Sequence, residues 1–147
     1  MPRFARLFEA AADTLNAYYQ AVADNSIDAV MSLWIDEEFA TCICANGTHL
    51  HGLEDIRSGL ARQLEAEAVT IEPLDIRVYD SLGTVVYAIA EAHQPAGTVA
   101  PRMIFTTYVM VHERGEWRIA HIHASEMPTE AAGQFAAKLR HGQGPLH

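Results

Sequence analysis

A carboxylate and an imidazole stand two residues apart near the end of a long apolar run, at Glu91 and His93. Side chains at positions i and i+2 of a β-strand point to the same face, so these two groups would lie about 6.5 to 7 Å apart. An acid and a base at this spacing can move protons on a bound molecule if their surroundings are dry. The same pair could instead be two polar groups that hydrogen-bond near a sheet end. Both interpretations stay open here.

Cysteines and histidines also occur in pairs with one residue between them. The pairs are Cys42/Cys44, His49/His51 and His121/His123. Same-face imidazoles can chelate a divalent ion, but the first histidine pair abuts a turn and lacks a matched carboxylate, so we expect surface or interface histidines and no metal or other cofactor. Close cysteines along a strand seldom bridge, and we expect small buried thiols rather than a nucleophile.

The histidines of the last pair belong to a strand-like run, Glu116 to Ser125, that alternates strictly. Strict alternation assigns five of its residues to one face of the strand. These residues are Trp117, Ile119, His121, His123 and Ser125. The run follows three others of similar length, and short turn-rich links predict an antiparallel meander.

Helices precede this meander in the predicted order of elements. Apolar residues at three- and four-residue steps predict a first helix over 4–22, and Ser26 can cap a second one over 27–34. The sequence further predicts short strands over 39–45 and 48–51, a helix over 53–66, and long strands over 69–80, 84–94, 102–112 and 117–127. A short helix over 129–139 and a disordered end from His141 to His147 would follow. Helices followed by a sheet indicate an α+β fold.

The chain has 147 residues and a net charge of -9, with no basic cluster. This length fits one domain, taken as residues 1–128, followed by a C-terminal extension over 129–147. The acidic balance excludes binding to nucleic acid by counterion release. No apolar run reaches the roughly 20 residues that span a bilayer, and the N-terminus lacks the apolar block of a signal peptide. We therefore expect a cytoplasmic protein without a membrane partner.

Three stretches of the chain resemble the nuclear transport factor 2-like superfamily, the cone-shaped fold of ketosteroid isomerases and SnoaL-like polyketide cyclases. They are Tyr18 to Trp34 with Asp36 to Glu38, Thr41 to Gly47 with Gly52 to Ile56, and Val111 to Trp117 running into His121 to Ser125. The resemblance covers Leu7 to Pro128 and is most specific to the association domain of calcium/calmodulin-dependent protein kinase II and its SnoaL-like bacterial relatives. It implies N-terminal helices on a curved, mostly antiparallel sheet that encloses a pocket.

The resemblance extends to the fold, but most of the catalytic residues of these relatives are not matched in this chain. Alignment with ketosteroid isomerases places Tyr18 at their oxyanion tyrosine, but their general-base aspartate falls on Cys42. No carboxylate stands over 104–106, where their second acid would lie, and a dienolate mechanism needs both a base and paired donors. The pocket-lining basic residues of the kinase association domain are not matched either. Function on this scaffold must therefore be argued from the site.

The resemblance implies that one face of the second long strand points into the cone. Glu91 and His93 lie on this face and are the catalytic candidates. The other predicted pocket residues are Tyr18, Trp34, Cys42, Tyr87, Ile89, Met103, Phe105 and Thr107. Tyr18 and Trp34 could equally be core aromatics. The opposite sheet face, with Ile104, Thr106 and Tyr108, would then pack against a second copy in a homodimer.

Two functions fit these expectations. The first is a small-molecule-binding protein or enzyme of the SnoaL-like type, with isomerase, cyclase or dehydratase-like acid/base chemistry on a small apolar or carbonyl-bearing compound. The alternative is a non-catalytic association module that resembles the kinase hub. Whether the chain is an enzyme stays open, and its small-molecule ligand is not specified by the sequence.

Overall fold

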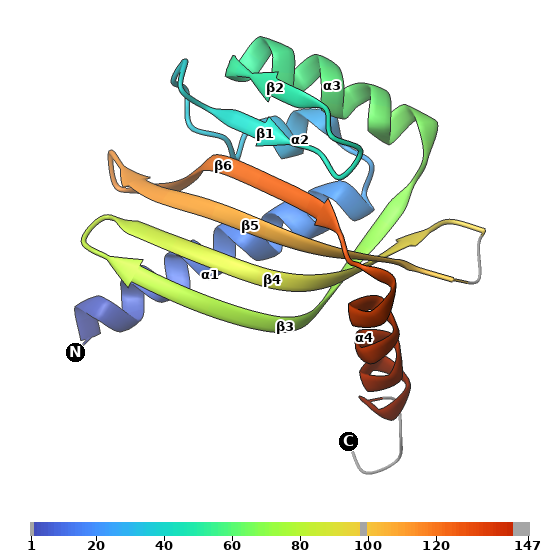
Figure 1. The fold of residues 1–147 in the computed structure, drawn as a ribbon. Helices are drawn as coiled ribbons and strands as arrows, with labels where there is room; N and C mark the ends of the chain where they lie inside the picture. Colours follow the sequence, from blue (N-terminus) through green and yellow to red (C-terminus); the bar gives the residue numbers. More distant parts are fainter. Residues whose placement is uncertain (1, 98–99, 143–147) are drawn as a thin grey trace.

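The computed structural model describes residues 2–97 and 100–142, with side chains described over 10–97 and 100–137 (Figure 1). The helices are α1 (Pro2–Ala23), α2 (Ile27–Met31), α3 (Gly52–Ala66) and α4 (Thr129–Gly142). The strands are β1 (Thr41–Ile43), β2 (His49–His51), β3 (Val69–Ser81), β4 (Thr84–Pro95), β5 (Arg102–Glu113) and β6 (Glu116–Glu126). The α+β class is therefore confirmed.

The strands form one sheet in the order β2-β1-β6-β5-β4-β3 (Figure 1). β3 to β6 are an antiparallel meander, and β1 joins it by pairing parallel to β6. Gly83 and Gly115 both have a positive φ in the tight turns of this meander, a conformation that glycine adopts without steric cost. The predicted curved, mostly antiparallel sheet is confirmed.

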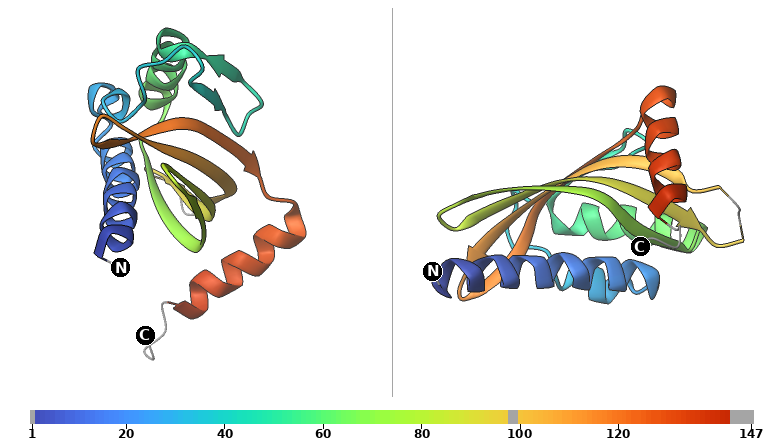
Figure 2. Two further views of the ribbon diagram at one scale, coloured as in Figure 1. Left: turned by 90° about the vertical axis from the view of Figure 1, so that its left-hand side faces the viewer. Right: turned by 90° about the horizontal axis from the view of Figure 1, so that it is seen from below.

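Helices α1 and α3 lie on one side of the curved sheet, and α4 lies on the other (Figure 2). The apolar stripe of α1 explains its position, since Ala11, Leu15 and Tyr18 are all buried in the main core. A smaller apolar cluster forms where α4 meets the outer face, around Ala92 and Met103. Among the described residues, no helix combines the length and apolar composition needed to cross a membrane.

Some elements are shorter or longer than expected. α2 ends at Met31 rather than Trp34, because the chain turns there and Trp34 forms a parallel bridge to Ile119. β1 is limited to Thr41–Ile43, since Cys44 already belongs to the turn that leads into β2. The C-terminal helix continues to Gly142, three residues beyond the expected end at Leu139. Of the tail predicted to be disordered, 143–147 lie outside the described residues.

The expected alternation of the last strand is wrong at one position. Val109 pairs with His121 while the next residue, Met110, pairs with Ile119, so Ala120 is an extra residue in β6. Such a β-bulge exchanges the two faces of the strand beyond it. Trp117 and Ile119 therefore face the helices, but His121, His123 and Ser125 lie on the outer face.

The expected pocket-facing side of β5 is also wrong. β4 and β5 pair with Tyr87 opposite Tyr108, Ile89 opposite Thr106 and Glu91 opposite Ile104. Residues directly opposite in an antiparallel pair share a face. The residues that share the inner face with Glu91 are therefore Ile104, Thr106 and Tyr108, whereas the sequence predicts them on the outer, dimer-forming face. Met103, Phe105 and Thr107 take that outer face instead.

One close contact in the fold gives a prediction about stability. A Cβ built on Gly59 of α3 would lie 2.6 Å from Leu50 Cδ1, whereas one on Gly133 of α4 would meet nothing within 4 Å. We expect Gly59→Ala to destabilise the protein by about 1 to 2 kcal/mol, since overpacking outweighs the gain in helix propensity. Gly133→Ala should stabilise it by about 0.5 to 1 kcal/mol. Urea denaturation checks both, and equal stability of the two variants would contradict the packing at Leu50.

Candidate functional site

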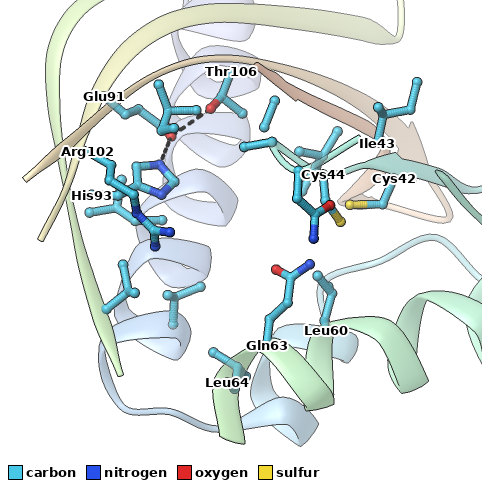
Figure 3. Close-up of a pocket in the computed structure, with 18 of the residues that line it drawn as sticks. Cys42, Ile43, Cys44, Leu60, Gln63, Leu64, Glu91, His93, Arg102 and Thr106 are labelled. Carbon is cyan, nitrogen blue, oxygen red and sulfur yellow. Dashed lines mark hydrogen bonds and ion pairs between the residues drawn. The ribbon is translucent and has the colours of Figure 1, made fainter. Parts of the chain in front are cut away.

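A cavity of about 300 Å³ lies between the inner face of the sheet and helices α1 and α3 (Figure 3). In Figure 3 His93 and Arg102 lie on one side of it, and Cys42, Cys44 and Gln63 lie on the other. Aliphatic side chains, including Leu60 and Leu64 of α3, make up much of the remaining wall. This volume is at the small end of the range for small-molecule pockets.

Glu91 is the buried centre of a hydrogen-bond network, with 0% of its surface exposed. Tyr19 Oη and Tyr108 Oη donate to its Oε2 over 2.8 and 2.6 Å. Thr106 Oγ1 and His93 Nε2 each lie 2.8 Å from its Oε1. An ionised carboxylate can accept all four bonds, and buried charges persist when they are satisfied in this way.

The four partners come from three elements. His93 stands two residues after Glu91 on β4, and Thr106 and Tyr108 reach it from the neighbouring strand β5. Tyr19 approaches from α1, where the Tyr18, Tyr19 and Tyr108 rings pack against one another. Burial and the nearby Glu91 carboxylate raise the pKa of Tyr19 and of Tyr108 well above the usual value of a tyrosine. Both hydroxyls therefore keep their protons and donate them in hydrogen bonds to Glu91.

Within this network, Glu91 and His93 have two different roles. The oxygens of Glu91 are occupied by protein donors, so this side chain holds its neighbours in place. His93 lines the cavity with 20% of its side chain exposed. Since a carboxylate oxygen accepts the bond, Nε2 of His93 carries a proton and Nδ1 is the nitrogen left for other partners. A histidine oriented by a buried carboxylate is a recurrent arrangement for proton transfer.

Arg102 adds a positive charge beside His93 (Figure 3). Its guanidinium donates to Glu67 Oε1 over 2.7 Å, and about half of the side chain, 54%, is exposed. Because the pair is at the surface, water screens it and the arginine can turn toward a ligand at little cost.

The opposite wall carries the two cysteines, which are free and buried. Hydrogen bonds from Cys42 and Gln63 lower the pKa of Cys44 to about 6, although burial opposes the shift. The pKa of Cys42 is raised, because it donates to Cys44 and because it is buried.

Four of the ten predicted site residues line the cavity: Tyr18, Cys42, Glu91 and His93. Trp34, Tyr87 and Ile89 are buried in the main core instead. Met103, Phe105 and Thr107 lie on the other face of the sheet, as the strand register requires. The partners of Glu91, namely Tyr19, Thr106 and Tyr108, were not predicted from the sequence. The β4–β5 register places the last two on the face of Glu91.

Both histidine pairs lie on the outer face, where β1 separates them. Thr41 is paired with His51 on one side and with His121 on the other, and its Oγ1 lies 2.7 Å from His121 Nδ1. Within the described part of the chain, no three histidine, cysteine or acidic side chains are grouped so that they could hold a metal ion.

His121 gives a prediction about pH. Burial lowers its pKa from 6.5, and the neighbouring His123 and His49 lower it further. The unfolded chain then binds a proton more readily than the folded one, so the contribution of His121 to stability is present above about pH 6.5 and is lost as the pH falls. We expect His121→Gln to lose less stability than the parent on acidification, as measured by urea denaturation at several pH values. An identical decline in the two proteins would contradict the shift.

The family model described as a SnoaL-like domain matches residues 11–130. No curated protein matches the chain significantly. A candidate calcium/calmodulin-dependent protein kinase type II association domain from Thiobacillus denitrificans is similar in structure, with a TM-score of 0.70 and 23% identity over 78% of this chain and 93% of that chain.

Two further solved structures are described by enzyme activities. A candidate dehydratase of the NTF2-like family from Streptomyces avermitilis has a TM-score of 0.76 and 17% identity, over 82% of this chain and 96% of that chain. A candidate ketosteroid isomerase from Shewanella frigidimarina has a TM-score of 0.67 and 17% identity, over 79% of this chain and 94% of that chain. At these identities the likeness shows a shared fold.

Proposed function

The chain belongs to the SnoaL-like domain family, and from this premise we propose that its pocket binds a small carbonyl-bearing compound on which His93 moves a proton. The observation that carries the proposal is the 2.8 Å contact between His93 Nε2 and the buried Glu91 Oε1 at the cavity wall. Glu91 fixes the orientation of the imidazole, and His93 presents Nδ1 to the ligand. This is the chemistry of an isomerase, cyclase or dehydratase-like enzyme.

The wall of the cavity suits the charge that such a reaction develops. Taking a proton from the carbon beside a carbonyl creates negative charge on the carbonyl oxygen, which needs hydrogen-bond donors. Arg102 on the side of His93 and the Gln63 amide on the other side can supply them (Figure 3). The aliphatic lining, which includes Leu60, would exclude water from the remainder of the ligand.

The solved relatives support this choice of chemistry without defining the substrate. The dehydratase-like and isomerase-like neighbours share the fold and are described by reactions that move protons. The proposed base differs from that of the ketosteroid isomerases. Cys42 stands at the position of their base, and His93 would take the proton in this chain. The substrate must also be small, since the cavity measures about 300 Å³.

A thermal-shift screen against small ketones, unsaturated carbonyl compounds and carboxylic acids tests the proposal. A compound that binds the folded state raises the melting temperature according to its affinity. We expect some of these compounds to raise the melting temperature of the parent, and we expect Leu60→Trp, which fills the cavity, to abolish this rise. If no carbonyl compound stabilises the parent, the proposed ligand class is wrong.

A second proposal concerns self-association. The association-domain neighbour favours it, as does apolar exposure on the outer face of the sheet, where Tyr79 is 62% and Phe105 39% exposed. We propose that this face packs against a second copy in a homodimer. The non-catalytic association module is then the alternative to the enzyme: light scattering that finds a large ring, together with an empty ligand screen, would favour it.

A further inference from the structure

The chain has two cysteines, and both lie on one wall of the cavity. Cys42 is 3% and Cys44 7% exposed, and neither is in a disulfide. Figure 3 shows their sulfur atoms side by side, across the cavity from His93. Neither sulfur takes part in the proton transfer proposed above, so the pair needs a separate explanation.

A disulfide between these sulfurs is disfavoured by the backbone. Cys42 lies in β1 and Cys44 directly follows the strand. Extended backbone separates residues i and i+2 by about 6.5 to 7 Å at Cα, the upper end of the roughly 4.4 to 6.8 Å that a disulfide spans. The backbone is held on both sides of the pair, since Cys42 belongs to β1 and the Cys44 amide donates to Thr48 O over 2.9 Å. The sulfurs can therefore be joined more readily by an intervening atom than by a direct bond.

The number of ligands restricts what that atom can be. A structural zinc ion takes four ligands, but the described residues contain no group of three histidine, cysteine or acidic side chains that could hold a metal. Thiolates are soft ligands that favour copper(I), zinc and iron–sulfur clusters, and of these copper(I) is the one that is stable with only two thiolates. The amide of Gln63, which donates to Cys44, would support the ligand as an outer partner.

We propose that Cys42 and Cys44 are the two ligands of a soft monovalent cation of the copper(I) type, bound at the cavity wall. Both sulfurs bind the cation as thiolates, so the protons that the two thiols carry pass to solvent as the metal binds. No atom changes its oxidation state. The site uses neither Glu91 nor His93, and it stands whether or not the proton-transfer proposal holds.

The test is an anaerobic titration of the reduced full-length protein with copper(I) in competition with a coloured copper(I) chelator. The parent should remove one equivalent of copper per chain from the chelator. Cys42→Ser and Cys44→Ser should each weaken binding by at least about 100-fold, and Gln63→Leu by about 10-fold or more, as for outer partners of metal ligands. The His49→Gln/His123→Gln double variant is the matched control and should bind like the parent.

Two results of the titration would overturn the proposal: a parent that fails to compete with the chelator, or a Cys42→Ser/Cys44→Ser double variant that binds as tightly as the parent. X-ray absorption of the copper-loaded parent gives an answer that does not depend on the folding of any variant. Two sulfur neighbours are expected around the metal. A nitrogen-dominated shell would assign the copper to histidines and contradict the site.

Discussion

Replacing Glu91 by alanine is expected to destabilise the protein by about 3 to 5 kcal/mol. The change removes the acceptor of four hydrogen bonds at a side chain that is 0% exposed. The Tyr108 and Thr106 hydroxyls are buried with it, so both donors would lose their acceptor inside the protein. Urea denaturation measures the loss as a change in the free energy of unfolding.

Two further variants make this result specific. Glu91→Gln keeps one acceptor oxygen and the same shape, so its loss should lie between that of the alanine variant and zero. Glu126 also lines the cavity but is exposed, and Glu126→Ala should change stability by no more than about 0.5 kcal/mol. If Glu91→Ala is as stable as Glu126→Ala, the network does not exist in solution.

The second large effect concerns activity. On any carbonyl compound that the parent turns over, His93→Gln is expected to lower kcat by about 10² to 10⁴, the usual contribution of a positioned general base. Glutamine can still donate to Glu91, and the side chain of His93 is 20% exposed, so we expect the variant to fold and to bind the ligand. The thermal shift that the ligand produces measures binding separately from the rate.

The matched control is His123→Gln, on the outer face of the sheet. This side chain is exposed and points away from the cavity, so its replacement should leave kcat and the thermal shift unchanged. A His93→Gln variant with parental kcat would rule out His93 as the base. A variant that loses ligand binding and rate to the same extent would instead indicate a binding residue.

The sequence predicted the parts of this molecule that depend on local pattern. The periodicity of α1, the turns of the meander and the shared face of Glu91 and His93 all follow from spacing along one element. The network around Glu91 could not be predicted in this way, because Tyr19, Thr106 and Tyr108 reach it from other elements. Their positions depend on strand register, and a shift of one residue exchanges the two faces of a strand.

The bulge at Ala120 shows the same limit within one strand. Nothing in the alternation of β6 indicates an extra residue, since the pairing with β5 alone defines it. Its effect is large, because it moves His121 and His123 out of the face that Trp117 and Ile119 occupy. The histidines therefore belong to the outer surface, whereas His93 lines the cavity.

The most direct test of the proposed activity is deuterium incorporation into a ligand of the parent protein, followed by NMR in heavy water. If His93 is the base, a bound carbonyl compound exchanges protons at the carbon next to its carbonyl far faster than in buffer, and His93→Gln removes the acceleration. Ligands that bind in the cavity but exchange no faster than in buffer would contradict catalysis by His93 and leave a binding protein.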